Sequence, residues 1–336
     1  MSGPYNFLTQ WKEARNLVLS PKSQLAWQGT LALASLTQRQ RFDGGAVFAL
    51  SSSRRSDQGY SGKGTSFATN GQVTAWDTKF QGLKAELSPW LAGWLFAFLC
   101  GTDTVTGAGP YVHTFNFDET TRTAVPTTLY IEDTAAVKYV CPDMCMDEVT
   151  LTINEIGAIV AECSMLGTGY QTIGALTPLP ALAAESYILG SDAALTFGAG
   201  AGTVMIGRHM KTVIKAQNQL QAHRACGGGY YGLFIRKGNP KFSIATTIAA
   251  KDTDDIFTLF QNDTAAVFTL TVNSGATAIL TISVPVAHLK TTKLGFDGDM
   301  EVWELEFDET SAFDVGGVSP FTVTVTNSVA SYLVGA

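Results

Sequence analysis

Charged side chains are scarce in this sequence: Asp, Glu, Lys and Arg make up 15% of its 336 residues, whereas 46% are hydrophobic. Soluble domains usually carry about 25% charged residues. Because so few charges cover a chain of this size poorly, we expect much of its surface to be hidden in an assembly. The formal net charge of -7 also argues against tight binding to nucleic-acid phosphates.

Cysteines are few, and their number, five, is odd. The first ten residues, MSGPYNFLTQ, contain neither the basic region nor the apolar run of a secretory signal. We therefore expect a reduced protein that is made in the cytoplasm. The most apolar run covers residues 90–100, whereas a membrane helix needs about 20 residues. No membrane anchor is expected.

Residue patterns that would mark a catalytic or metal site are also missing. The four histidines fall on different predicted elements without HxxxH or HExxH spacing, and Cys141 and Cys145 have no second pair of ligands beside them. No Gly-x-Ser-x-Gly nucleophile motif occurs. We therefore expect a protein that is not an enzyme, with no cofactor, no metal site and no catalytic residue.

The sequence does contain a repeat of parts, spaced about 140 to 170 residues apart. Each copy begins with a β-rich stretch that ends in a long polar loop, within residues 47–72 in the first half and 210–240 in the second. A returning strand and a short helix follow, and a pair of strands closes the copy. The strand pairs, residues 139–166 and 280–307, each contain a proline, Pro142 or Pro285, and a glycine turn.

The two expected helices differ in character. The first has Ser88 as its N-cap, Pro89 at its first helical position and Gly101 just past its end. It is apolar on all sides, so we expect it to be buried. The second is amphipathic, and Asp252 is its expected N-cap.

Together these patterns predict a mainly β protein with two tandem β-sandwich or barrel modules. Each module is flanked by a short α-helix and carries a long hairpin loop. The expected boundaries are an N-terminal arm at 1–24, a first module at 25–172, a linker at 173–182 and a second module at 183–336. The arm contains Trp11, Ala14, Leu17 and Val18 at helical spacing, which fits a short helix or a frayed terminus equally.

Small basic groups recur in the two long loops of this acidic chain. Such groups suit docking onto acidic residues of a neighbouring subunit, although solvated loop charge explains them as well. The basic residues are Arg54, Arg55 and Lys63 in the first loop and Arg224, Arg236 and Lys237 in the second. The candidate acidic partners are Glu86, Asp252, Asp254 and Asp255.

From about residue 25 to the end, the chain resembles the tail tube (major tail) proteins of long-tailed, siphovirus-like bacteriophages. The resemblance rests on the order of parts and on five passages: TTLYIEDTAAVKYVCPDM, ALTFGAGAG, YYGLFIRKGNPKFSI, AKDTDDIFTLF and VPVAHLKTTKLGFDGDMEVWELEF. It implies a virion protein whose inner sheet joins those of its neighbours around a lumen. Rings of such proteins stack into a hollow tube through which DNA passes without specific binding.

The same resemblance implies partners and stoichiometry. Relatives with one tube domain form hexameric rings, so a duplicated domain implies homotrimeric rings with pseudo-sixfold symmetry. Other tail proteins, namely the tape measure, tail tip and terminator proteins, would be partners, and synthesis would take place in the cytoplasm of the host bacterium.

Two other classes of protein fit the residues. One is another structural virion component, such as a capsid, sheath or baseplate protein. The other is a carbohydrate- or receptor-binding β-sandwich, for which Tyr60, Tyr230 and Tyr231 would supply an aromatic platform.

Overall fold

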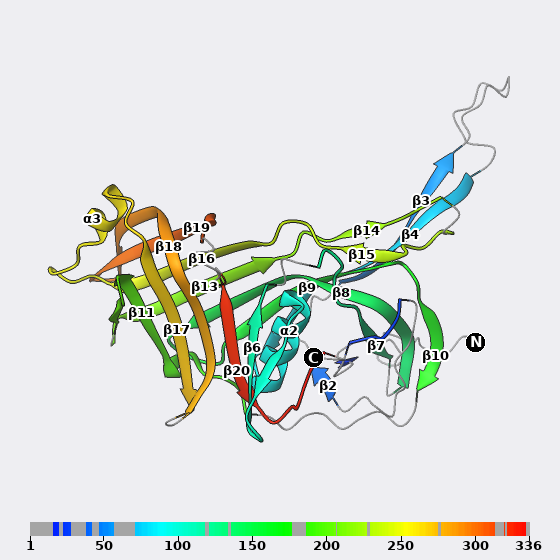
Figure 1. Ribbon diagram of the computed structural model, residues 1–336, viewed down its shortest axis with the longest axis horizontal. Helices are drawn as coiled ribbons and strands as arrows, with labels where there is room; N and C mark the ends of the chain where they lie inside the picture. Colours follow the sequence, from blue (N-terminus) through cyan, green and yellow to red (C-terminus); the bar gives the residue numbers. More distant parts are fainter. Residues whose placement is uncertain are drawn as a thin grey trace, which may run out of the picture.

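The computed structural model describes residues 16–19, 23–27, 38–41, 47–56, 71–117, 121–133, 136–176, 186–205, 207–226, 229–274, 277–312, 319 and 321–333. These residues form a mainly β protein (Figure 1), as the sequence predicts. The described strands of the first half are β1 (Asn16–Leu19), β2 (Gln38–Arg41), β3 (Val47–Ser56), β4 (Gly71–Glu86), β5 (Thr104–Thr106), β6 (Tyr111–Asn116), β7 (Thr127–Asp133), β8 (Ala136–Asn154), β9 (Val160–Gly167) and β10 (Thr172–Leu176).

The second half continues the same style of structure. Its described strands are β11 (Ala193–Ala199), β12 (Thr203–Val204), β13 (His209–Gln217), β14 (Gln221–His223), β15 (Phe234–Arg236), β16 (Lys241–Ala249), β17 (Ala266–Ser274), β18 (Thr277–Asp297), β19 (Met300–Ala312) and β20 (Thr322–Asn327). The helices are α2 (Pro89–Cys100), α3 (Ile256–Gln261) and the short 3-10 helix η2 (Gly190–Asp192). No helix in the described part of the chain is long and apolar enough to cross a membrane.

A central antiparallel sheet runs through both halves of the chain. Its strands pair in the order β3-β4-β9-β8-β13-β16-β19-β18. The pairing of β8 with β13 joins the first half of the sequence to the second. The sheet does not close into a barrel within the chain, because β3 and β18 lie at its two ends.

Two long strands carry the chain between the central sheet and its flanking sheets. The N-terminal part of β8 pairs with β7 and β10, and that of β18 pairs with β17 and β20. Their C-terminal parts lie in the central sheet. The register shifts near Pro142 and Pro285, since proline has no N–H for the strand ladder. Both prolines thus lie within a continuous strand, whereas the sequence placed them near a strand end.

Strand pairings in the two halves correspond one to one. β1, β2, β3, β4, β7, β8, β9 and β10 match β11, β12, β13, β16, β17, β18, β19 and β20, in that order. Each of the seven pairings within the first set has a counterpart in the second. The hairpins β5–β6 and β14–β15 have no counterpart among the described strands.

Helix α2 lies in the core, and its two caps are as predicted. The Ser88 hydroxyl accepts a hydrogen bond from the Leu91 N–H at 3.2 Å, and Gly101 ends the helix with φ of 82°. Every residue from Trp90 to Cys100 is buried. The helix contributes its aromatic side chains to the main hydrophobic cluster.

Helix α3 begins later than the sequence predicts. Asp255, with no side-chain capping bond, is the N-cap in place of Asp252. Asp254 closes the preceding turn by accepting from the Lys251 N–H at 2.9 Å, and it also bonds Arg208. These contacts hold the acidic residues in a turn before the helix. At the N-terminus, Asn16–Leu19 is a strand rather than part of the helix that its spacing suggested.

Candidate assembly interface

The two ends of the central sheet are strand edges. Among the described residues, β3 pairs only with β4, and residues 289–297 of β18 pair only with β19. Edge strands present rows of N–H and C=O groups that favour pairing with another chain. These two edges are therefore the first candidates for contacts between copies of the protein.

The junction between β8 and β13 shows how two such edges meet within the chain. Its register pairs Glu148 with Gln217 and Leu151 with Ile214. The Lys215 ammonium lies 3.0 Å from a Glu148 carboxylate oxygen across the junction. In the strand correspondence, β8 matches β18 and β13 matches β3. The junction thus joins the counterparts of the two free edges.

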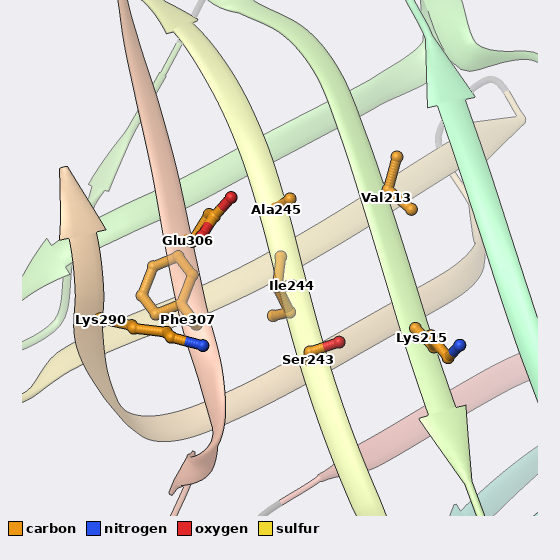
Figure 2. A pocket seen from close by; sticks show the side chains of 8 residues that line it. All are labelled: Val213, Lys215, Ser243, Ile244, Ala245, Lys290, Glu306 and Phe307. Atoms are coloured by element: carbon orange, nitrogen blue, oxygen red, sulfur yellow. The ribbon is translucent and has the colours of Figure 1, made fainter. Parts of the chain in front are cut away.

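One face of the central sheet is polar and the other faces the core. Along β13, Thr212, Ile214 and Ala216 are buried, whereas the intervening residues point away from the core. Figure 2 shows part of the polar face, a shallow hollow over β13, β16, β18 and β19. Its lining residues are Val213, Lys215, Ser243, Ile244, Ala245, Lys290, Glu306 and Phe307. Charges on this face pair across strands, as in the 2.9 Å contact of Lys293 with Glu304.

The predicted basic residues fall into different environments. Arg224 bonds Asp77 and donates to the Trp76 carbonyl oxygen at 3.0 Å, which ties the second long loop to β4. Arg236 is exposed on β15. The backbone at Arg54 and Arg55 belongs to β3, but their side chains, like all of Lys63, lie outside the description.

Lys237 is buried rather than presented at the surface. It is 7% exposed, and its ammonium lies 3.5 Å from the Cys100 carbonyl oxygen at the end of α2. A positive charge stabilises the C-terminal end of a helix, where carbonyl groups are unpaired. Lys237 thus has a structural role in this chain, and the surface contact predicted for it does not fit its position.

The predicted acidic residues lie at the other end of the same strands. β4 begins at Gly71 and ends at Glu86, and β16 begins at Lys241 and leads into the turn before α3. Glu86, Asp252 and Asp255 are exposed, whereas Asp254 is bound to Arg208. The structure therefore does not bring the predicted basic and acidic partners together in one chain.

The buried cysteines and the buried histidine His113 are part of the packed core. Burial raises the pKa of Cys100, Cys141 and Cys163 to about 12, so these thiols stay protonated and weakly nucleophilic. The buried His113 contacts Asp103 at 2.8 Å, and its other ring nitrogen lies 2.8 Å from the Val329 carbonyl oxygen. Within the described residues, no three His, Cys, Asp or Glu side chains are placed to hold a metal ion.

Of the predicted aromatic platform, Tyr60 lies outside the description. Tyr230 is 49% exposed, and Tyr231 packs edge-on against Tyr170. Sequence reasoning missed the exposed phenylalanines Phe257 and Phe260 of α3. Their spacing of three on an amphipathic helix was the available signal.

Taken together, the fold and the candidate surfaces define a β-protein whose central sheet, within the described residues, has two open edges and an extended polar face. The chain belongs to the phage tail tube protein family, whose family model matches residues 34–310. It is thus a structural protein of the phage tail, located in the virion, that self-assembles and associates with other tail proteins. A search of curated proteins found no match to this chain.

Proposed function

We propose that this protein forms closed rings by continuing its central sheet from one copy to the next, and that the rings stack into the tail tube. In each contact, residues 289–297 of β18 pair with β3 of the neighbouring copy. The observation that carries this proposal is the β8–β13 junction, which joins the counterparts of these edges in antiparallel register.

The register of the proposed contact follows from partners that the two halves share. In the first half, Leu151 of β8 lies opposite Ala161 of β9. In the second half, Leu294 of β18 lies opposite Trp303 of β19. Ala161 follows the valine of β9 that pairs with the last residue of β4. In the same way, Trp303 follows the valine of β19 that pairs with the last residue of β16. Leu294 is therefore the counterpart of Leu151.

The same reasoning identifies the partner on β3. Ile214 of β13 lies opposite Ile244, and Phe48 of β3 lies opposite Phe80. Ile244 and Phe80 occupy equivalent positions, because they lie opposite Phe307 of β19 and Met165 of β9. Since Leu151 pairs with Ile214, Leu294 should pair with Phe48 of the next copy. Lys293 should then lie opposite Ala49.

The strand correspondence supports a duplicated tube domain. We place one module at about residues 25–172 and the other at 183–336. Strand β1, which lies before residue 25, also belongs to the first module, and strand β10 extends its end to Leu176. Each module supplies four strands to the central sheet. Three chains would bring six such sets, so a homotrimeric ring with pseudo-sixfold symmetry replaces the hexamer of single-domain relatives.

The polar face of the central sheet would line the lumen. Its lysines and glutamates pair across strands, as Lys215 does with Glu148 and Lys293 with Glu304. Such pairing leaves no continuous run of positive charge to hold phosphates. DNA would therefore pass through without specific binding.

Stacking and the remaining partners complete the proposal. The basic loops of one ring, with Arg54, Arg55, Lys63 and Arg236, would face the exposed acids Glu86, Asp252 and Asp255 of the next. The tube ends would bind tail tip and terminator proteins, and the lumen would hold a tape measure protein before DNA enters. Synthesis takes place in the cytoplasm of the host bacterium.

A pair of cysteines tests the ring contact. In a Cys226→Ser background, which removes the exposed native thiol, Ala49→Cys with Lys293→Cys should form a disulfide between copies. Residues directly opposite on antiparallel strands have Cα atoms about 4.5–5.5 Å apart, within the Cα separation of about 4.4–6.8 Å that disulfides span. The matched control is Ser51→Cys with Lys293→Cys, shifted by two residues on the same face.

Electron microscopy of the oxidised sample should show rings, and denaturing electrophoresis should show a ladder that ends at the trimer. Equal cross-linking of both cysteine pairs, or compact monomers at high concentration in the presence of a tail tip seed, would contradict the proposal.

A further inference from the structure

Helices α2 and α3 hold equivalent positions but differ in how they are covered. α2 follows β4 and α3 follows β16, and these strands are counterparts in the central sheet. α2 is buried from Trp90 to Cys100. In α3 only Ile256 and Leu259 are buried, whereas Phe257 is 52% exposed and Phe260 is 41% exposed.

Elements from the other half of the chain cover α2. It lies between β8 of its own half and β20 of the second half. The Asn327 amide at the end of β20 donates to the Pro89 carbonyl oxygen at 3.1 Å, and the ring of Phe321 packs on Phe96. Figure 1 shows α2 beside β20 and β6. β20 thus reaches α2 from across the β8–β13 junction.

The corresponding cover for α3 is absent from the described part of the chain. α3 packs on β18, the counterpart of β8, and the ring of Phe257 meets Trp303 edge-on at 4.9 Å between centroids. The counterpart of β20 is β10, which pairs with β8 as β20 pairs with β18. Figure 1 places β10 and α3 at opposite ends of the molecule, so β10 of the same chain does not reach α3.

We propose that Phe257 and Phe260 of α3 dock onto the flanking sheet of the next copy, at β10 and the N-terminal part of β8. This inference rests on the proposed ring. When β18 of one copy pairs with β3 of the next, the neighbour's flanking sheet takes the place relative to α3 that β20 takes relative to α2. The occupant of the exposed phenylalanine face is thus a second copy of this chain.

The chemistry of the two helices fits one permanent contact and one that forms on assembly. α2 contains no charged residue, which suits a surface that is never exposed in the folded chain. α3 limits its exposed apolar surface to two phenylalanines next to the exposed acids Asp252 and Asp255. Interfaces of proteins that are soluble before association combine aromatic anchors with a polar rim in this way.

Photo-cross-linking in assembled tubes locates the occupant. Phe260 is replaced with p-benzoylphenylalanine, and isotope-labelled and unlabelled chains are mixed so that links between copies are recognised by mass spectrometry. We expect links between copies to residues 136–144 and 172–176. Links confined to one chain, or links to other segments, would overturn the docking assignment.

A paired variant gives the energetic test. Phe257→Ser with Phe260→Ser should raise the concentration needed for ring formation about tenfold or more, the loss typical of removing interface anchors. Gln261→Ser, an exposed neighbour on the same helix, should leave it unchanged. An unchanged threshold in the double variant contradicts the proposal.

The Ala49–Lys293 cysteine pair is examined in the same samples to separate the two ideas. Disulfides without the expected photo-cross-links leave the ring contact standing and reject the α3 contact. If the cysteine pair forms no disulfides in protein with the wild-type α3 sequence, the ring contact is rejected. The α3 contact, which depends on it, is then rejected as well.

Discussion

At the scale of single residues, the polar groups of the core show why local sequence patterns could not reveal their roles. Lys237 has the sequence surroundings of a loop cation, yet it lies against the end of α2, a contact that depends on a residue 137 positions away. His113 and Asp103 form a buried pair that also binds the C-terminal segment, because Asp103 accepts from the Tyr332 N–H at 2.9 Å. Such partners are set by tertiary packing, which spacing along the chain does not encode.

His209 should make folding sensitive to mild acid. It begins β13, and its Nε2 lies 2.7 Å from the Thr212 hydroxyl oxygen. Together with Glu155 and Asp192, His209 lines a second pocket, separate from the hollow of Figure 2. Burial lowers the pKa of His209 in the folded protein, against the backbone contact at Ala193, which raises it. In the pH range between the lowered folded pKa and the unfolded value, the unfolded chain binds more protons, so stability rises with pH. Acidification from neutral pH through about 6.5 should therefore lower the free energy of unfolding.

Urea unfolding at pH 7.5 and pH 5.5 measures this effect. His209→Gln keeps a hydrogen-bonding group near Thr212 but does not titrate, so its midpoint should change less between the two pH values than that of the wild type. His223→Gln, on an exposed loop strand, is the matched control and should behave as the wild type. An equal pH response in His209→Gln and the wild type would rule out His209 as the cause.

At the scale of elements, local signals predicted what local forces determine. The N-cap, the first-turn proline and the terminal glycine placed α2 correctly, because each acts within one helical turn. The predicted start of α3 was wrong, because Arg208, in the turn before β13, binds Asp254 and changes the local turn. The path of β8 and β18 through two sheets was not predictable either. A proline marks a break in the ladder, but whether the strand continues beyond it depends on the neighbouring strands.

The close packing of α2 against the C-terminal segment predicts that Gly93 tolerates no added methyl group. A Cβ on Gly93 would lie 2.5 Å from the Tyr332 hydroxyl oxygen, which donates to the Trp90 carbonyl oxygen at 2.9 Å. Gly93→Ala should lower the free energy of unfolding by about 1–3 kcal/mol through overpacking, although alanine favours helices. The control is Gly295→Ala, whose Cβ would meet only a Glu304 carboxylate oxygen at 3.7 Å. Equal stabilities for the two variants would show that the C-terminal segment is not packed against α2.

At the scale of the whole molecule, the proposed ring requires that the two open edges of the central sheet are counterparts of the strands that join its two halves. Sequence order predicted two similar modules, and seven strand pairings of the first half have counterparts in the second, whereas the hairpins β5–β6 and β14–β15 have none. The sequence did not predict that the modules join through β8 and β13, since strand pairing across a module boundary has no local signature. In the proposed ring, that junction is the template for the contacts between copies.

Opposite charges at opposite ends of the sheet predict that rings stack head to tail. Arg54→Glu, Arg55→Glu and Arg236→Glu combined should leave ring formation intact but prevent tubes. The substituted loops would carry negative charge and would be repelled by the acidic residues of the next ring. Lys79→Glu, Lys84→Glu and Lys211→Glu change the net charge equally on exposed positions of the central sheet and serve as the control.

Asp252→Lys with Asp255→Lys should restore tubes in the variant with the three arginine substitutions, since it re-creates opposite charges across the contact between stacked rings. Electron microscopy at low and high salt measures tube length, and wild-type tubes should shorten as salt screens the contact. Normal tubes from the triple variant, or no restoration by the lysine pair, would show that rings stack through other groups. Because restoration requires the two charge sets to meet, it also tests the relative direction of successive rings.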